Sequence, residues 1–262
     1  MLTQKEKLEL IAIEDERSRR AARRRLWRYM PYPKQMEFHA AGATDRERLL
    51  MAGNQLGKTL SAGFEVAMHL TGLYPEPGQT FYPDTPQMRE HGLAGKDVWP
   101  NGWPGRRWRR PIWCWASSVS GESTRDNPQR YLVGDPALSE KWGTGTIPGE
   151  MMIRGDGTWD VDRASQPQHA LDAVRVKHYT DGIFDGTSLC QFKSYSQGRE
   201  KWQGPSIDLV WWDEEPPMDI YMEGLTRTNA TDGIGMLTFT PLLGLSDVVR
   251  MFISDESELD NT

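Results

Sequence analysis

The segment AGNQLGKT, residues 52–59, constrains the fold of this 262-residue chain more than any other stretch. The apolar run ERLLMA at 47–52 leads into it and predicts a buried strand. After it, LSAGFEVAMHL repeats apolar residues at helical spacing until Gly72. A glycine-bearing loop between a strand and a helix binds phosphate, because backbone N–H groups and the positive end of the helix face the anion. The segment therefore predicts a phosphate-binding loop in an α/β domain.

The residue types within this loop predict a nucleoside triphosphate, ATP, and a magnesium ion. Lys58 would reach between the β- and γ-phosphates, and the Thr59 hydroxyl would ligate Mg²⁺. Such loops normally begin with glycine, whereas here Ala52 occupies the first position and Gly53 the second. The whole loop is expected to contact the nucleotide: Ala52, Gly53, Asn54, Gln55, Leu56, Gly57, Lys58 and Thr59.

A second polar sequence follows the apolar run IDLVWW at 207–212. The run predicts a strand that delivers Asp213 to the carboxyl edge of the sheet, where it can hold Mg²⁺ through water. Glu214 would polarise the attacking water as general base, and Glu215 is less suited because Pro216 follows it. An Asp-Glu pair after a strand is more often a turn or helix start. Because a phosphate loop precedes it in this chain, we interpret the Asp213-Glu214 pair as functional.

Other apolar runs predict the remaining strands of a mostly parallel, doubly wound sheet flanked by helices. Because strands alternate with helices and end in polar residues, the expected fold is α/β, a P-loop NTPase of the ASCE type. Two of the runs are joined by a Gly- and Asp-rich turn and are expected to pair with each other. The expected strands are 111–116, 174–179, 188–194 and 235–240.

The segments between the strands predict two short helices and two irregular stretches. One helix is expected over residues 33–42, and another runs to about Val133 with Ser123 or Thr124 as its cap. The irregular stretches are rich in Pro and Gly. They are 73–110, expected as a loop or insertion on the surface of the core, and 134–170.

Charge is unevenly distributed along the chain. The formal net charge is −6, yet residues 1–28 carry nine basic and five acidic side chains, which leaves −10 on the remainder. Residues 3–28 read as a helix, with seven arginines between Arg17 and Arg28. This basic arm is expected either to meet an anionic partner, nucleic acid or an acidic neighbour, or to be a solvated helix.

Several other protein classes lack support in the composition. No apolar stretch approaches the roughly 18 residues of a membrane span, and the first residues lack the apolar core of a secretory signal. Cys114 and Cys190 are the only cysteines, so neither a disulfide framework nor a zinc site is expected. A cytosolic protein is expected.

The order of motifs along the chain resembles the large terminase of tailed phages. This resemblance covers roughly residues 30–250 and is more specific than any single motif. It is carried by YPKQ from Tyr32, AGNQLGKT from Ala52, STRDNPQR from Ser123, WWDEEPP from Trp211 and LTFTP from Leu237.

The resemblance implies roles for further residues. Tyr32 and Gln35 would contact the adenine, and Thr240, in the coupling motif 238–241, would sense the γ-phosphate. Many terminases place an arginine inside the phosphate loop, where this sequence has Asn54. Another arginine is then expected to act, either from this chain or from a neighbouring subunit, and the alternative for each candidate is a surface salt bridge. The candidates are Arg125 and Arg130, with Arg199 as a third.

The resemblance also implies a division of the chain and a nuclease that it does not contain. We expect a basic helical arm at 1–30, an ATPase domain at 31–250, and an acidic tail or the start of a linker at 251–262. Family members continue into an RNase H-like nuclease. Nuclease activity is therefore not expected from this chain.

The implied function is a Mg²⁺-dependent ATPase motor that packages double-stranded DNA into a procapsid in the host cell cytoplasm. The implied partners are DNA, the portal protein, the small terminase subunit and further copies of the chain in a ring, with no membrane. The run WPNGWPGRRWRR at 99–110 could contact DNA, or its tryptophans could pack the insertion onto the core. The alternatives are a helicase-like translocase and a nucleotide-binding assembly module with little hydrolysis, against which Glu214 argues.

Overall fold

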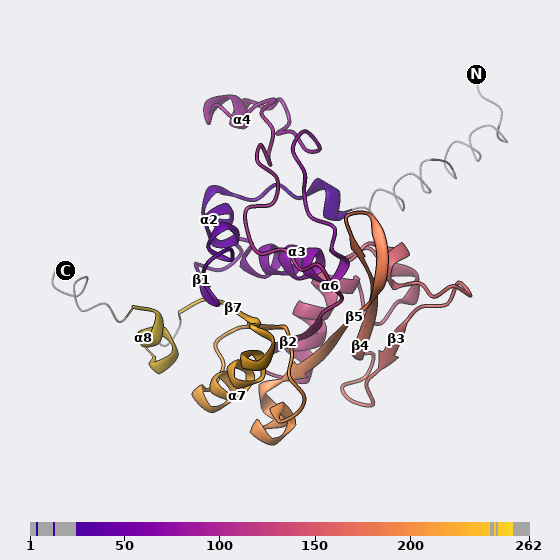
Figure 1. Ribbon diagram of the computed structural model, residues 1–262, viewed down its shortest axis with the longest axis vertical. Helices are drawn as coiled ribbons and strands as arrows, with labels where there is room; N and C mark the ends of the chain where they lie inside the picture. The colour runs from indigo at the N-terminus through magenta and orange to yellow at the C-terminus, as the bar shows by residue number, and fades with distance from the viewer. Residues whose placement is uncertain (1–3, 5–12, 14–24, 242–243, 245, 254–262) are drawn as a thin grey trace.

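A seven-stranded sheet organises the computed structural model, which describes residues 4, 13, 25–241, 244 and 246–253. The strand order is β1-β7-β6-β2-β5-β4-β3 (Figure 1). Neighbours from β1 to β5 pair in parallel, whereas β4 pairs antiparallel with β5 and β3 antiparallel with β4. The strands are β1 Glu47–Met51, β2 Trp113–Ser118, β3 Val161–Arg163, β4 Leu171–Thr180, β5 Ile183–Ser194, β6 Leu209–Asp213 and β7 Ile234–Phe239.

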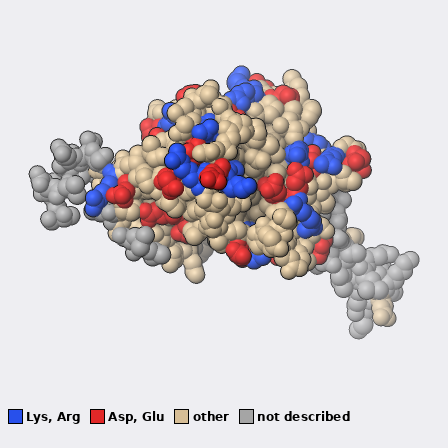
Figure 2. Space-filling model, turned by 90° about the horizontal axis from the view of Figure 1, so that it is seen from below, with Lys and Arg blue, Asp and Glu red and all other residues tan. Residues whose placement is uncertain are grey.

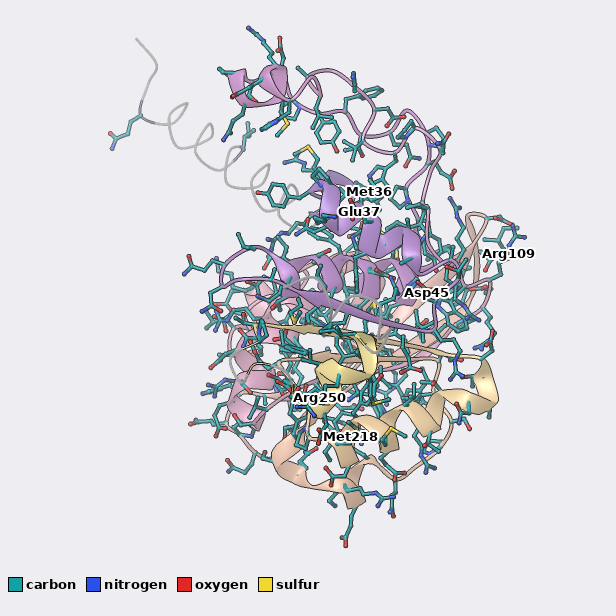
Figure 3. All side chains as sticks on the ribbon, turned by 90° about the vertical axis from the view of Figure 1, so that its left-hand side faces the viewer. Met36, Glu37, Asp45, Arg109, Met218 and Arg250 are labelled. Carbon is teal, nitrogen blue, oxygen red and sulfur yellow. The ribbon has the colours of Figure 1, made fainter. Side chains whose placement is uncertain are left out.

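Helices lie on both faces of this sheet. Figure 3 shows α2, which carries Met36 and Glu37, on one side, and α7 and α8, which carry Met218 and Arg250, on the other. The α-helices are α2 Pro33–Ala41, α3 Lys58–Thr71, α4 Pro86–Glu90, α5 Gly121–Thr124, α6 Arg130–Val133, α7 Met218–Thr228 and α8 Asp247–Ile253. A π-helical turn, Arg125–Gln129, joins α5 to α6, and short 3-10 turns occur elsewhere.

Alternating side chains of the central strands supply two separate cores. In β6, Leu209 and Trp211 belong to the core beneath α3, while Val210 and Trp212 belong to the core beneath α7 and α8. Every residue of β6 is buried, as expected for a parallel strand covered on both faces. The prediction of a mostly parallel sheet flanked by helices, a P-loop ATPase-like α/β fold, is confirmed.

Several predicted boundaries and one segment differ from expectation; β4 and β5, for example, extend beyond the expected 174–179 and 188–194. The helix after β2 is capped by Ser120, whose Oγ accepts from the Ser123 backbone N–H at 3.1 Å, so the expected cap at Ser123 or Thr124 is wrong. β2 itself lies two residues later than the expected 111–116. The segment 134–170, expected to be irregular, contains the short strand β3. Helix α7, which was not predicted, follows the Asp-Glu pair.

The segment 73–110 is more deeply built into the fold than a surface insertion. Its tip around α4 contains no buried residue and extends from the body in Figure 1. Its second half, in contrast, contributes Trp99, Trp103 and Trp108 to the core beneath α3. The expectation of a purely superficial segment is therefore wrong, because tryptophan burial outweighs the loop-like composition.

The chain ends lie mostly outside the described residues. Of the basic arm, the described part includes the 3-10 turn Arg25–Arg28, and Leu26 and Tyr29 are buried in the core. Residues 251–253, expected in an acidic tail, form the end of α8, and the acidic positions from 255 onward lie outside the described residues. Within the part of the chain that the structure describes, no helix is long and apolar enough to cross a membrane.

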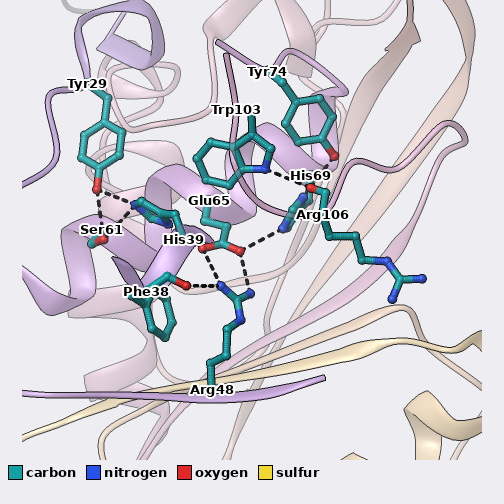
Figure 4. A network of polar contacts seen from close by, with 10 residues as sticks. All are labelled: Tyr29, Phe38, His39, Arg48, Ser61, Glu65, His69, Tyr74, Trp103 and Arg106. Carbon is teal, nitrogen blue, oxygen red and sulfur yellow. Dashed lines mark hydrogen bonds and ion pairs between the residues drawn. The ribbon is translucent and has the colours of Figure 1, made fainter. Parts of the chain in front are cut away.

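A buried network around Glu65 joins α2, β1 and α3 (Figure 4). The Glu65 carboxylate is fully buried and contacts Arg48 Nη2 at 2.6 Å, His39 Nδ1 at 2.6 Å and His69 Nε2 at 3.2 Å. Burial alone raises the pKa of Glu65, but Arg48 and the hydrogen bonds from both histidines hold that pKa well below its usual value. The network fixes α3, and hence the loop from which α3 begins, against α2.

Candidate active site

The phosphate loop leaves β1 and turns sharply into α3. Gly57 caps the helix with φ at +78° and Gln55 has φ at +61°, so the loop uses two left-handed residues within its last turn. A Cβ at Gly57 would lie 3.0 Å from Gln35 Nε2, which leaves little room for any larger residue. The predicted strand–loop–helix arrangement of residues 47–72 is confirmed.

Lys58 lies at the mouth of the loop and links it to the end of β7. Its ammonium donates to the carbonyls of Ala52 at 2.9 Å and Gly53 at 2.8 Å, and to Thr240 Oγ1 at 3.0 Å. Thr240 Oγ1 in turn donates to Asn54 Oδ1 at 2.9 Å. Lys58 is 8% exposed, so a cation is held at low solvent access where the loop faces the sheet edge. Three of the predicted site residues, Lys58, Thr240 and Asn54, therefore meet through their side chains.

Asp213 is buried at the end of β6, directly beside the phosphate loop. Its Oδ1 accepts from Thr59 Oγ1 and from Thr238 Oγ1, each at 2.9 Å, and Thr238 is also its register partner on β7. Its Oδ2 is buried and has no hydrogen-bond partner within the described chain. Burial raises the pKa of Asp213 to about 7, although the bonds from Thr59 and Thr238 oppose the rise. A carboxylate with an unsatisfied oxygen next to a threonine hydroxyl is a fitting pair of ligands for a hard cation.

Glu214 follows in an unusual backbone conformation. Its φ is +67°, a region that non-glycine residues enter at a cost of about 1–3 kcal/mol. Its backbone N–H donates to the Thr238 carbonyl at 2.8 Å. Burial raises the pKa of Glu214, and Lys58 opposes that rise. A carboxylate of raised basicity next to the phosphate loop suits proton abstraction from water.

Tyr195 is a site residue that the sequence analysis missed. Its hydroxyl donates to the carbonyls of Asp213 at 3.0 Å and Glu214 at 2.8 Å. One signal was available: Tyr195 directly follows the predicted strand 188–194, so a parallel strand would place it at the same sheet edge as Asp213.

A cavity of about 880 Å³ opens beside the loop, between α2, β1 and α8. Tyr32, just before α2, and Gln35, within α2, line it on one side, and Leu56 and Lys58 line it from the loop side. Tyr32 is 65% exposed, whereas Gln35 is 6% exposed and donates to the Gly57 carbonyl at 3.2 Å. Asp213 does not line this cavity, but Lys58 does. Because Thr59, the next residue, bonds to Asp213, the loop connects a space large enough for a nucleoside to the end of β6.

Comparison with known proteins identifies the family. The family model described as terminase large subunit, T4likevirus-type, N-terminal, matches residues 49–261. The chain belongs to this family. A large terminase subunit of Salmonella phage P22 is 41% identical over 98% of this chain and 48% of its own length. A large terminase subunit of Enterobacteria phage LP7 is 27% identical over 98% of this chain and 50% of its own length.

The chain thus spans about half the length of the curated terminases it matches. Among solved structures, a large terminase from the thermophilic bacteriophage D6E aligns with a TM-score of 0.45 and 10% identity. That alignment covers 80% of this chain and 39% of the other.

The arginines proposed for this terminase chain all have acidic neighbours. Arg125 pairs with Asp126 at 2.8 Å and also donates to the Gln168 carbonyl, and Arg130 pairs with Asp135 at 2.9 Å. Arg199 pairs with Glu223 at 2.9 Å. The hydrogen bonds and ion pairs found for these three arginines do not reach residues 52–59, so their catalytic role stays a prediction.

The run 99–110 packs its tryptophans into the protein core. Its three tryptophans are buried, so stacking of bases on them is not supported. Its arginines also face carboxylates: Arg106 pairs with Asp232, Arg107 with Glu76, Arg109 with Asp181 and Arg110 with Asp208. Figure 2 shows such basic and acidic residues interspersed over one face of the molecule.

Proposed function

We propose that residues 31–250 of this chain form the ATPase motor domain of a large terminase, which hydrolyses ATP to move double-stranded DNA into a procapsid. The observation that carries the proposal is the meeting of three segments at one sheet edge. Lys58 bonds to Thr240, and Thr59 bonds to Asp213, which Thr238 also holds. This supports a shared site for triphosphate, cation and water.

Nucleotide binding would use the surfaces on both sides of Lys58. The adenine would enter the cavity at Tyr32 and Gln35, while loop residues 52–59 offer backbone N–H groups to the phosphates. Lys58 would exchange the carbonyls of Ala52 and Gly53 for phosphate oxygens. The binding energy would then come from charge-assisted bonds at a partly desolvated cation.

Thr59 and Asp213 would hold Mg²⁺, which when bound neutralises charge on the phosphate oxygens. The unpaired Asp213 Oδ2 supports this assignment, because a buried carboxylate oxygen without a donor is costly unless a cation or proton satisfies it. In the described residues no group of three or more His, Cys, Asp or Glu side chains forms a metal cage. That agrees with Mg²⁺, which keeps several waters and binds through few protein ligands.

Glu214 would act as the general base. It would take a proton from water as the water oxygen attacks the γ-phosphorus and the bond to the β–γ bridging oxygen breaks, giving ADP and phosphate. Thr240, which contacts both Lys58 and Asn54, is positioned to respond when the γ-phosphate leaves. Movement of β7 would then carry the signal toward DNA.

The partners follow from family membership and remain part of the proposal. We infer that the motor acts in the host cell cytoplasm with the portal protein, the small terminase subunit and further copies of itself in a ring. Arg125 or Arg130 of one copy would serve the active site of another. A typical arginine of this kind supplies about 10³–10⁵ in rate, so the isolated chain should turn over slowly.

Phosphate release and nucleotide binding, measured on the same preparations, test the function. Lys58→Ala should lose both, whereas Glu214→Gln should retain ATP binding and lose about 10²–10⁴ in turnover. Glu215→Gln, the same chemical change one residue later, should leave turnover within about 2-fold of the unsubstituted protein. If turnover of the unsubstituted chain equals that of Lys58→Ala while ATP still binds, the chain is a nucleotide-binding assembly module instead.

A further inference from the structure

Tyr195 stands at the sheet edge where the catalytic carboxylates lie, although it comes from a different strand. β5 runs parallel to β2, and its last residue, Ser194, pairs with Ser118 at the end of β2. Tyr195 therefore begins the chain beyond the carboxyl edge. The next residue, Ser196, donates its N–H to the Val119 carbonyl at 3.0 Å, which fixes this turn to the end of β2.

The tyrosine side chain is buried and extends from this turn toward the end of β6. It is 6% exposed, and its ring lies 6.1 Å from the Trp202 ring, centroid to centroid. Its hydroxyl bonds to the Asp213 and Glu214 carbonyls at 3.0 and 2.8 Å. Burial, followed by the charge of Asp213, raises the pKa of Tyr195 well above its usual value, so the hydroxyl keeps its proton and acts as a donor.

The residue that receives this bond needs support. Glu214 has φ at +67°, where a side chain with a Cβ is disfavoured and persists only when its surroundings hold it. The Thr238 carbonyl accepts from the Glu214 N–H at 2.8 Å, and Tyr195 binds the Glu214 carbonyl. The backbone of Glu214 is thus held at both ends, from β7 on one side and from the turn after β5 on the other.

We propose that Tyr195 is a positioning residue for hydrolysis, which fixes the left-handed backbone of Glu214 and so aims its carboxylate at the attacking water. This inference rests on the proposed function, in which Glu214 is the base. The hydroxyl of Tyr195 bonds to the backbone carbonyls of Asp213 and Glu214, so its proposed effect on hydrolysis passes through Glu214. Asp213 is held independently by Thr59 and Thr238, so loss of the tyrosine hydroxyl leaves the cation ligand in place.

Steady-state ATP hydrolysis and equilibrium ATP binding of Tyr195→Phe test this role. The substitution removes one oxygen and keeps the packed ring. We expect kcat to fall about 10- to 100-fold, as for a base displaced by a fraction of an ångström, with KM and the ATP dissociation constant within about 2-fold.

The matched control is Tyr74→Phe. Tyr74 is partly buried and its hydroxyl also makes two hydrogen bonds, with the Trp108 N–H at 2.8 Å and His69 Nδ1 at 3.0 Å, but it lies beyond the C-terminal end of α3. Tyr74→Phe should match Tyr195→Phe in loss of thermal stability and leave kcat unchanged. Equal effects of the two substitutions on kcat would overturn the inference.

A double substitution separates this inference from the proposed function. In Glu214→Gln, where the base is already gone, adding Tyr195→Phe should change the residual turnover by less than about 2-fold. A further large loss would show that Tyr195 acts elsewhere and would overturn the inference while leaving Glu214 as the base. If turnover of the unsubstituted chain does not exceed that of Lys58→Ala, the proposed function fails, and the positioning role fails with it.

Discussion

Two buried carboxylates, Glu65 within α3 and Asp213 at the end of β6, have opposite electrostatic settings. Glu65 contacts Arg48, His39 and His69, and its pKa is held well below the usual value. Asp213 accepts from two threonine hydroxyls on one oxygen and from no group of the described residues on the other, and burial raises its pKa to about 7.

The difference distinguishes a carboxylate whose partners lie within the fold from one that we propose binds a cation. A buried charge surrounded by cations and donors is satisfied within the chain, and removing it leaves its partners unpaired. A buried charge with a free oxygen lowers stability until a cation arrives, which is a usual arrangement at functional sites. The contrast therefore supports a cation at Asp213 and a purely structural role for Glu65.

Neutralising the Glu65 carboxylate should change the free energy of unfolding most. Glu65→Gln should lower the free energy of unfolding by about 3–5 kcal/mol at pH 8, because the Arg48 guanidinium is left buried without its anion. Urea unfolding measures the loss. The matched control, Asp84→Asn, alters an ion pair that is two-thirds exposed and should give no measurable change. Equal stability of Glu65→Gln and the unsubstituted chain would contradict the assigned role of the network.

Asp213→Asn should instead raise the free energy of unfolding at neutral and higher pH. The folded pKa of about 7 exceeds the unfolded value of 3.8, so the folded protein retains a proton that the unfolded chain releases. Stability is therefore lost as pH rises from about 4 to about 7, and the variant should exceed the unsubstituted protein by up to about 4 kcal/mol above pH 7.

The check is urea unfolding at pH 4 and pH 8 without nucleotide or Mg²⁺. The two proteins should be equally stable at pH 4 and differ at pH 8. A variant less stable at pH 8 than the unsubstituted chain would mean that Asp213 is satisfied within the fold after all, like Glu65.

A substitution at Thr238 should have a smaller effect on stability, because it removes one of the two donors to Asp213. Thr238→Val keeps the shape and loses the hydroxyl that donates at 2.9 Å and also accepts from Trp211 Nε1. We expect a loss of about 1–3 kcal/mol, since two buried polar groups lose a partner. Thr238→Ser, which keeps the hydroxyl, should recover most of it. Calorimetric melting of the three proteins at pH 8 measures the series.

Much of the site could be predicted because it is encoded locally. The loop 52–59 lies between a short apolar run, typical of a buried strand, and a run with apolar residues at helical spacing. Both patterns can be recognised from neighbouring residues alone. The run that ends at Asp213 is equally compact, and parallel pairing brings its end to the loop. These local patterns therefore predicted that the loop and Asp213 meet at one edge of the sheet.

The remainder depends on contacts between distant segments, which no local pattern reports. Tyr195 acts on residues 18 and 19 positions away through a neighbouring strand, and its own sequence context resembles an ordinary turn. Composition described 73–110 as a loop, yet the burial of Trp103 there depends on where α3 and His39 lie. The arginine that would complete the site stays unassigned for a related reason, because it is expected from another copy of the chain.

The segment 73–110 combines a fixed base with an exposed tip. Trp99, Trp103 and Trp108 anchor its second half in the main core, while α4 contributes no buried residue and projects from the body in Figure 1. Deleting this segment would expose the core of the domain, whereas attaching a label at its tip would not. A dye attached to Glu90→Cys, at an exposed position of α4, would therefore follow the orientation of the domain without contacting the cavity beside Lys58.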